Sequence, residues 1–175
     1  MREIQETPGQ VTFKSAWRDY FKGYFDFTGR TTRAGYWWAM LILMIVWFMP
    51  FFALLFAQAA KVQLKMSGAL VLYIIVIGLL GVLTFIPTLA LSVRRYRDAG
   101  LNGRGAVVLW LLNGFASRFT SGNQGRAWTL ISALIGLTLF IITLLKTDTI
   151  TTNSDNPLVA FFLRKSASQP KRSEH

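Results

Sequence analysis

The chain has 175 residues, of which 53% are apolar and 15% are charged, and its net charge is +11. Soluble domains are about 25% charged and about 50% apolar or less, so this composition excludes an ordinary soluble domain. A soluble protein this basic would suggest nucleic-acid binding. Here the basic residues flank apolar runs, so we expect membrane lipids as partners and no nucleic acid.

The chain contains no cysteine, and its single histidine is the last residue, His175. Disulfides, thiolate metal sites and cysteine nucleophiles are therefore excluded. No pair of nucleophile and base can be named among the remaining residues. We accordingly expect no metal site, no cofactor and no enzyme activity.

The N-terminal arm has a polar part followed by an aromatic part. Residues 1–12 are polar and are expected to be disordered. Over residues 13–27, aromatic side chains recur every four positions, which places them on one face of a helix, with basic side chains on another face. This pattern predicts an interfacial amphipathic helix over 13–27, with Trp17 and Phe21 as membrane anchors. The alternative is an amphipathic helix that packs on the protein's own cytoplasmic surface.

Four apolar segments follow the arm, and we expect each to be a transmembrane helix. A run of about 18 or more apolar residues suffices for a crossing. Tyr36 and Trp37 form an aromatic belt at the start of the first span, and Pro50 and Pro87 are expected to kink the first two spans. The third segment is the shortest, and a re-entrant segment is its alternative. The expected spans are residues 36–60, 69–93, 103–119 and 128–145.

The distribution of basic residues predicts the orientation. Basic residues mark the cytoplasmic side of a membrane protein. Four spans place the basic arm, the second connection and the basic tail on one side, whereas three spans would divide the charge more evenly. We therefore expect an all-α integral membrane protein of the bacterial plasma membrane with both termini cytoplasmic. The tail, residues 146–175, is expected to be polar and mostly disordered.

Two arginine-rich boxes stand at the ends of the first two spans. The first box is "FDFTGRTTRAGYWW", residues 25–38, and the second is "VRRYRDAGLNGRG", residues 93–105. If the two helices are neighbours, the boxes converge, and we expect Asp98 to pair with an arginine of the first box. The surplus arginines and the glycines also suit an anionic lipid headgroup, so both roles stay open. The candidate residues are Arg30, Arg33, Arg94, Arg95, Arg97, Asp98, Gly100 and Gly103.

The two boxes together resemble the paired motifs of a bacterial membrane family, the domain of unknown function 805. The first box resembles its F-x-G-R-x-x-R-x-x-Y-W motif, and the second resembles R-R-x-H-D-x-G-x-S-G-W. Arg97, Asn102 and Arg104 depart from this pattern, because the family has His, Ser and an aromatic residue at these positions. The resemblance covers roughly residues 20–145. It implies a small inner-membrane protein with several helices and no known activity.

These observations favour a structural or interaction role. A basic cytoplasmic face would contact anionic lipid, a partner membrane protein or a second copy of the chain. The alternative is a small transporter or channel subunit. Apart from Arg104 and Arg118 at the ends of the third segment, however, no charged residue lies inside the expected spans, where an ion pathway often needs one.

Overall fold

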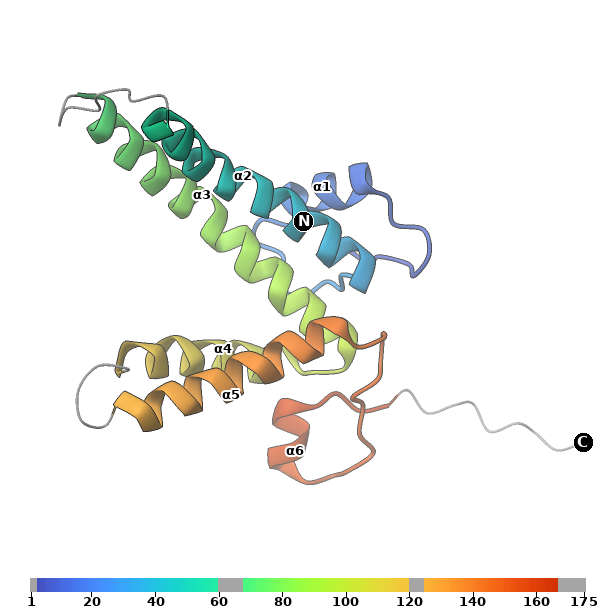
Figure 1. Ribbon diagram of the computed structural model, residues 1–175. Coiled ribbons are helices and arrows are strands. Elements are labelled where there is room, and N and C mark those ends of the chain that lie inside the picture. Colours follow the sequence, from blue (N-terminus) through green and yellow to red (C-terminus); the bar gives the residue numbers. More distant parts are fainter. Residues whose placement is uncertain (1–2, 60–67, 120–124, 167–175) are drawn as a thin grey trace, which may run out of the picture.

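The computed structural model describes residues 3–59, 68–119 and 125–166. Within these ranges the protein is helical and has no strand; only isolated bridges join extended segments. Two helical hairpins diverge from a common end, and two shorter helices flank that end (Figure 1). The helices are α1 (Phe13–Lys22), α2 (Arg33–Ala59), α3 (Gly68–Ala99), α4 (Gly103–Ala116), the 3-10 helix η1 (Ser117–Phe119), α5 (Gly125–Leu144) and α6 (Pro157–Phe162).

Three of the helices are long and apolar enough to cross a membrane. These stretches are Arg33–Ala53 in α2, Val71–Ala99 in α3 and Gly125–Leu144 in α5. Large apolar side chains cover the outside of these helices, and Phe56, for example, is 73% exposed. A continuous apolar surface of this kind is unfavourable in water and favourable in lipid. The expected span 103–119 is a helix of 14 residues followed by one 3-10 turn, so its length alone does not establish a fourth crossing.

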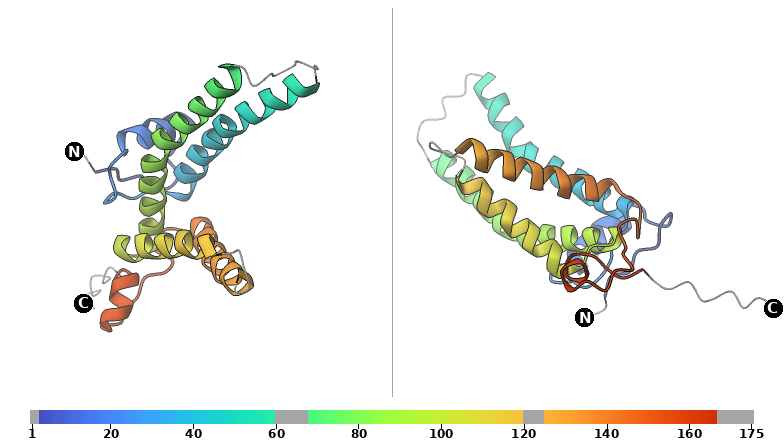
Figure 2. Two further views of the ribbon diagram at one scale, coloured as in Figure 1. Left: turned by 90° about the vertical axis from the view of Figure 1, so that its left-hand side faces the viewer. Right: turned by 90° about the horizontal axis from the view of Figure 1, so that it is seen from below.

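The hairpins are formed by α2 with α3 and by α4 with α5. Both extend away from the shared end, and they spread apart as they do so (Figure 1). The N-terminal end of α2, the C-terminal end of α3, the N-terminal end of α4 and the C-terminal end of α5 meet at one end of the molecule, here called the box end. Two views at right angles show the same arrangement (Figure 2).

Helix α1 is shorter than the expected 13–27. It begins after Thr12, whose hydroxyl and backbone N–H exchange hydrogen bonds with Ser15 in a capping box. It ends at Lys22, and Gly23 caps it. Gly23 lies against the guanidinium of Arg94, which leaves no room for a side chain at this position. Tyr20 is buried against the two long helices, and its hydroxyl lies 3.1 Å from the Thr88 hydroxyl.

Proline 87 lies inside α3, and the helix continues through it with a change of direction (Figure 2). A proline has no N–H group, so the carbonyl four residues before it, that of Leu83, loses its helical partner. The hydroxyl of Tyr24 donates a hydrogen bond to this carbonyl at 2.9 Å. The Thr84 hydroxyl lies nearby but donates to the Leu80 carbonyl.

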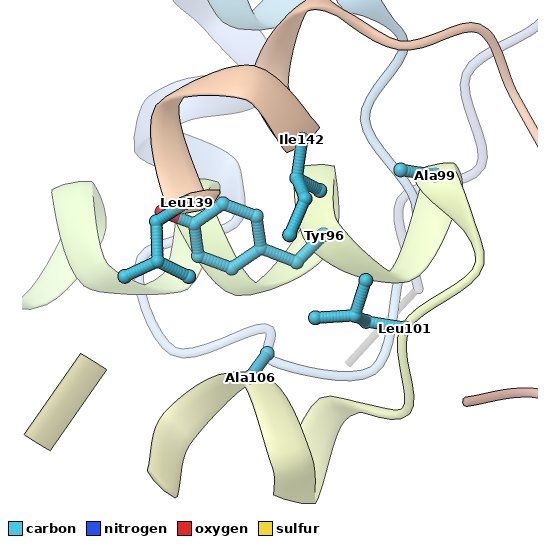
Figure 3. Close-up of a cluster of buried hydrophobic side chains, with 6 residues drawn as sticks. All are labelled: Tyr96, Ala99, Leu101, Ala106, Leu139 and Ile142. Carbon is cyan, nitrogen blue, oxygen red and sulfur yellow. The ribbon is translucent and has the colours of Figure 1, made fainter. Parts of the chain in front are cut away.

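Buried apolar side chains gather near the box end in two clusters. One cluster lies under α1 and contains Tyr20, Tyr36, Ala39, Leu43 and Leu91. The other joins α3, α4 and α5, and in it the ring of Tyr96 lies beside Leu139 and Ile142 (Figure 3). The hairpins are therefore held together mainly at one end.

Both segments that we expected to be disordered are partly ordered. Residues 4–6 run beside Arg30, whose N–H donates to the Ile4 carbonyl at 2.8 Å. After α5, the chain up to residue 166 returns over the second box, and the N–H of Arg164 donates to the Gly100 carbonyl at 2.8 Å. Polar composition suggested disorder, but backbone groups exposed at the box end give both segments hydrogen-bond partners.

Candidate functional site

The last turn of α3 carries three charged side chains that are almost completely buried. Arg94 and Arg95 are each 0% exposed, and Asp98 is 2% exposed. Buried charges are costly unless they are paired and hydrogen-bonded. The partners of these three residues therefore decide what the second box does.

Arg95 binds the C-terminal end of α5. Its Nε donates to the Thr143 carbonyl at 3.1 Å, and Nη2 donates to the carbonyls of Ile142 and Leu145. The last carbonyls of a helix lack partners within the helix and carry its negative dipole end. An arginine fork from a neighbouring helix thus caps α5 and supplies the complementary charge.

Asp98 pairs with Arg95 of its own helix, so the expectation that it pairs with the first box was wrong. One carboxylate oxygen accepts hydrogen bonds from Arg95 Nη1 and, at 3.0 Å, from the Thr147 hydroxyl. The spacing of three residues on α3 brings the two side chains together. Asp98 therefore orients the arginine that caps α5 and also binds the segment that follows α5.

The first box reaches the same helix end, so the convergence of the two boxes is confirmed. Arg33 Nη1 donates to the Leu144 carbonyl at 3.4 Å. Arg30 Nη1 lies 3.6 Å from the carboxylate of Asp148, which also pairs with Arg164. The boxes therefore meet through the end of α5 and the segment after it. They also contact each other directly, since Arg97 Nη1 donates to the Phe27 carbonyl and the Thr31 N–H donates to the Arg94 carbonyl.

Arg94 lies on the opposite side, beneath α1 and the N-terminal segment. Its Nη1 donates to the Asp19 carbonyl at 3.4 Å, while Nε and Nη2 have no hydrogen-bond partner among the described residues. The carboxylates of Asp26, Glu6 and Asp19 provide attractive charge around it. Arg94 thus holds the arm onto α3 largely through charge.

The pKa values of two of these carboxylates are shifted in opposite directions. Burial opposes ionisation of Asp26, but hydrogen bonds from the N–H groups of Ile4, Gly29 and Thr28 and from the Thr28 hydroxyl outweigh it, so its pKa lies below the usual value. Burial dominates at Glu6 and raises its pKa, although Thr32 donates its N–H at 2.8 Å and its hydroxyl at 2.9 Å.

The glycines of the boxes are positions of close backbone approach. Gly100 has a φ of +118°, and a side chain there would meet the backbone of Ile150 at 2.8 Å. Gly103 lies against Arg97, whose Nη1 donates to the Phe27 carbonyl at 3.4 Å. These glycines therefore fit internal packing.

The four expected interfacial anchors occupy different surroundings. Phe21 is 53% exposed, as an anchor should be. Trp17 is half-buried and stacks on Tyr20, with 5.6 Å between ring centroids. Tyr36 is buried in the cluster under α1, and Trp37 packs edge-on against Phe140 at 6.0 Å. The side chains of neighbouring residues at the start of a helix project in different directions, and that of Tyr36 projects into the protein interior.

The residues that sequence reasoning missed are acids and threonines, and all except Thr32 lie outside the two boxes. They are Glu6, Asp19, Thr32, Thr147 and Asp148. The scarcity of acidic residues was the signal that could have pointed to these acids, because the chain has eight acidic residues against nineteen basic ones. In the described part of the chain, no three histidine, cysteine or carboxylate side chains gather as potential metal ligands.

Comparison with known proteins places this arrangement in a family. No curated protein and no solved structure shows significant similarity to the chain. A family model described as a protein of unknown function, DUF805, matches residues 24–154, about three-quarters of the 175 residues. The match includes both boxes and the part of the segment after α5 that ends at residue 154. The chain belongs to the DUF805 family.

Proposed function

We propose that the protein is a four-span membrane protein with a structural or interaction role, whose basic cytoplasmic face contacts anionic lipid or a partner protein. The observation that carries this proposal is the use of the box arginines. Arg33 and Arg95 cap α5, and Arg30 and Arg97 bind a carboxylate and a carbonyl. Side chains engaged in this way hold helices in place, and this use favours a scaffold over an enzyme site.

Four crossings are supported by the pairing of α4 with α5. The two helices run antiparallel along each other, and α5 is long enough to cross (Figure 2). If α5 crosses, the end of α4 lies near the start of α5 on the far side. Arg104 and Arg118 near the ends of α4 and η1 can extend their charged groups toward the headgroups. Both termini then share the basic, cytoplasmic side.

An interfacial position of α1 is supported by its exposed side chains. Phe13 and Phe21 are 50% and 53% exposed, and Phe25, which follows the end of α1, is 58% exposed. Lys14, Arg18 and Lys22 are exposed on the same short helix. Apolar rings beside cations suit the boundary between acyl chains and anionic headgroups. Tyr20, on the inner side, holds α1 against α3.

Cysteine labelling tests the topology, because the natural chain has no cysteine to remove. Lys14→Cys, Arg118→Cys and Lys165→Cys place single thiols at exposed positions. With four spans, a membrane-impermeant maleimide added outside intact cells labels Arg118→Cys only. Labelling of Lys165→Cys in place of Arg118→Cys would establish three spans and refute the proposal.

Lipid contact is tested by reconstituting the protein into nanodiscs with and without phosphatidylglycerol. We expect the anionic lipid to raise the midpoint of thermal unfolding, and Lys14→Glu with Lys22→Glu to remove most of this gain. A midpoint independent of lipid charge would refute the lipid part of the proposal.

The second candidate, a small transporter or channel subunit, has one feature in its favour. A cavity of about 330 Å³ lies between the hairpins, and the hydroxyl-bearing residues Thr84, Thr88 and Ser92 line it. Trp47 and Trp110 line it from α2 and α4. Flux of small polar solutes into proteoliposomes that depends on the protein would favour this candidate over the scaffold.

A further inference from the structure

We propose that the N-terminal end of α2 carries a binding site for one anionic phospholipid. This inference rests on the lipid contact proposed above and narrows it from a basic face to a defined site. The site has a polar pocket for the phosphate headgroup and an adjoining apolar groove for an acyl chain.

The polar pocket has a volume of about 330 Å³ and lies between the N-terminal segment, the first turn of α2 and the segment after α5. Arg33 and Lys146 line it and are both exposed, so they present two positive charges. The Glu6 carboxylate already lies at the N-terminal end of α2, so these two side chains supply the positive charge of the pocket. A phosphate is the ligand that complements these groups.

The neighbouring polar groups are already occupied, which leaves the two cations for a ligand. The Glu6 carboxylate accepts both the N–H and the hydroxyl of Thr32. The Thr147 hydroxyl donates to Asp98. Arg33 has one hydrogen bond in the described structure, to the Leu144 carbonyl at 3.4 Å, so the rest of its fork faces no protein acceptor.

The apolar groove continues from the pocket along α2. It has a volume of about 490 Å³ and is lined by Ala34, Trp37, Trp38, Leu41 and Met44, and it shares Ala34 with the polar pocket. The ten steps from Ala34 to Met44 cover about 15 Å along a helix. This length is half of a hydrocarbon core of about 30 Å, the depth of one leaflet. An acyl chain attached to a headgroup in the pocket therefore follows the groove.

The indole of Trp37 contributes apolar surface to the groove one turn below the pocket. Its Nε1 is shielded from solvent and has no hydrogen-bond partner among the described residues, so the exposed part of the ring, and not the N–H group, faces an acyl chain in the groove.

Native mass spectrometry of the full chain tests the site, with phosphatidylglycerol and phosphatidylcholine offered in equal amounts. Lys146→Ala removes one charge of the pocket, and Ala34→Phe fills the opening between pocket and groove without changing charge. The matched controls are Lys165→Ala, an exposed lysine after α6, and Ala127→Phe, an exposed alanine in the first turn of α5. Circular dichroism confirms that each variant keeps its helix content.

We expect one phosphatidylglycerol per chain to be retained in preference to phosphatidylcholine. Lys146→Ala should weaken its binding about fivefold, the effect of one basic group beside an anionic lipid. Ala34→Phe should weaken it at least as much, and both controls should leave it unchanged. Glycerol phosphate, offered alone, should not be retained, because it has no acyl chain for the groove.

Three results would overturn the site. Equal weakening by Lys165→Ala and Lys146→Ala would show a diffuse basic face, which leaves the proposed function standing. A change from dimer to monomer in Ala34→Phe, with lipid binding unaltered, would show that a second copy fills the groove. Absence of any preference for phosphatidylglycerol in the parent chain would refute both the site and the proposed lipid contact.

Discussion

At the scale of single residues, Arg95 and Arg104 both belong to the second box but occupy opposite environments. Arg95 is completely buried and binds Asp98 and three carbonyls of the α5 end, whereas Arg104 is exposed. Removing one partner of a buried ion pair costs about 3–5 kcal/mol, because the other charge is left unpaired. We expect Arg95→Met to lower the free energy of unfolding by this amount.

Arg104→Met is the matched control for this change, and surface substitutions usually alter stability by about 0.5 kcal/mol or less. Reversible unfolding in mixed micelles by increasing amounts of a denaturing detergent measures both variants. Equal effects of the two substitutions would contradict the role of Arg95 as a cap for α5.

The glycine at position 100 supports a second prediction at this scale. Its φ of +118° disfavours a side chain, and a Cβ atom would meet the Ile150 backbone at 2.8 Å. We expect Gly100→Ala to lower the free energy of unfolding by about 1–3 kcal/mol. Gly114→Ala in α4, where the space is open, should instead be neutral or raise it by up to about 1 kcal/mol. The same unfolding assay distinguishes the two.

Glu6 and Asp26 predict opposite effects of pH on stability. The pKa of Glu6 is raised above 4.5 in the folded protein, so the folded state binds a proton more tightly and stability falls as pH rises through that range. The pKa of Asp26 is lowered below 3.8, so its contribution is present above that value and is lost as pH falls through the folded pKa.

Unfolding measured from pH 3 to pH 7 checks both signs. Glu6→Gln should gain stability relative to the parent as pH rises above about 4.5, since it keeps an acceptor for Thr32 without the buried charge. Asp26→Asn should lose stability relative to the parent at lower pH, as pH rises from 3 through about 3.8. Parallel curves for the parent and either variant would show that the corresponding carboxylate is not linked to folding.

At the scale of helices and segments, the arm and α3 depend on each other at Pro87. Tyr24 binds the carbonyl that the proline leaves without a partner. We expect Tyr24→Phe to destabilise the protein by about 0.5–1.5 kcal/mol, the net value of one hydrogen bond. If Pro87→Ala restores the helical N–H, the Tyr24→Phe substitution should cost less in that background. A double-mutant cycle on the same unfolding assay measures this coupling, and additive effects would contradict it.

The long helices and the meeting of the two boxes could be predicted from the sequence. Apolar runs predicted the long helices to within a few residues, because burial in lipid requires about 20 apolar residues. The paired boxes predicted the convergence of Arg33 and Arg95. The partner of Asp98 did not follow, because the choice between Arg95 and the first box depends on where α5 ends. The ordered residues 4–6 were missed for a similar reason, since their partners are backbone groups that no side-chain pattern reveals.

At the scale of the whole molecule, the chain beyond α5 holds the second box in place. The N–H of Asn102 donates to the Phe162 carbonyl at 2.8 Å, and Leu101 and Leu163 are bridged. Truncation after Ser154 removes both contacts and uncovers Leu101, which is 3% exposed. We expect the truncated chain to unfold at a lower temperature than one truncated after Ser166. Equal midpoints for the two truncations would contradict this role of α6.

The cap on α5 also has a consequence for the order of assembly during synthesis. Arg33 and Arg95 belong to the first hairpin, which leaves the ribosome before α5 does. Until α5 arrives, these arginines and Asp98 lack the carbonyl and hydroxyl groups that they bind in the finished protein. The first hairpin thus enters the membrane with an incomplete set of contacts, and the second hairpin completes it. A chain that stops before α5 keeps the Arg95–Asp98 pair within α3, but its Arg33 and Arg95 have none of the α5 carbonyls to bind.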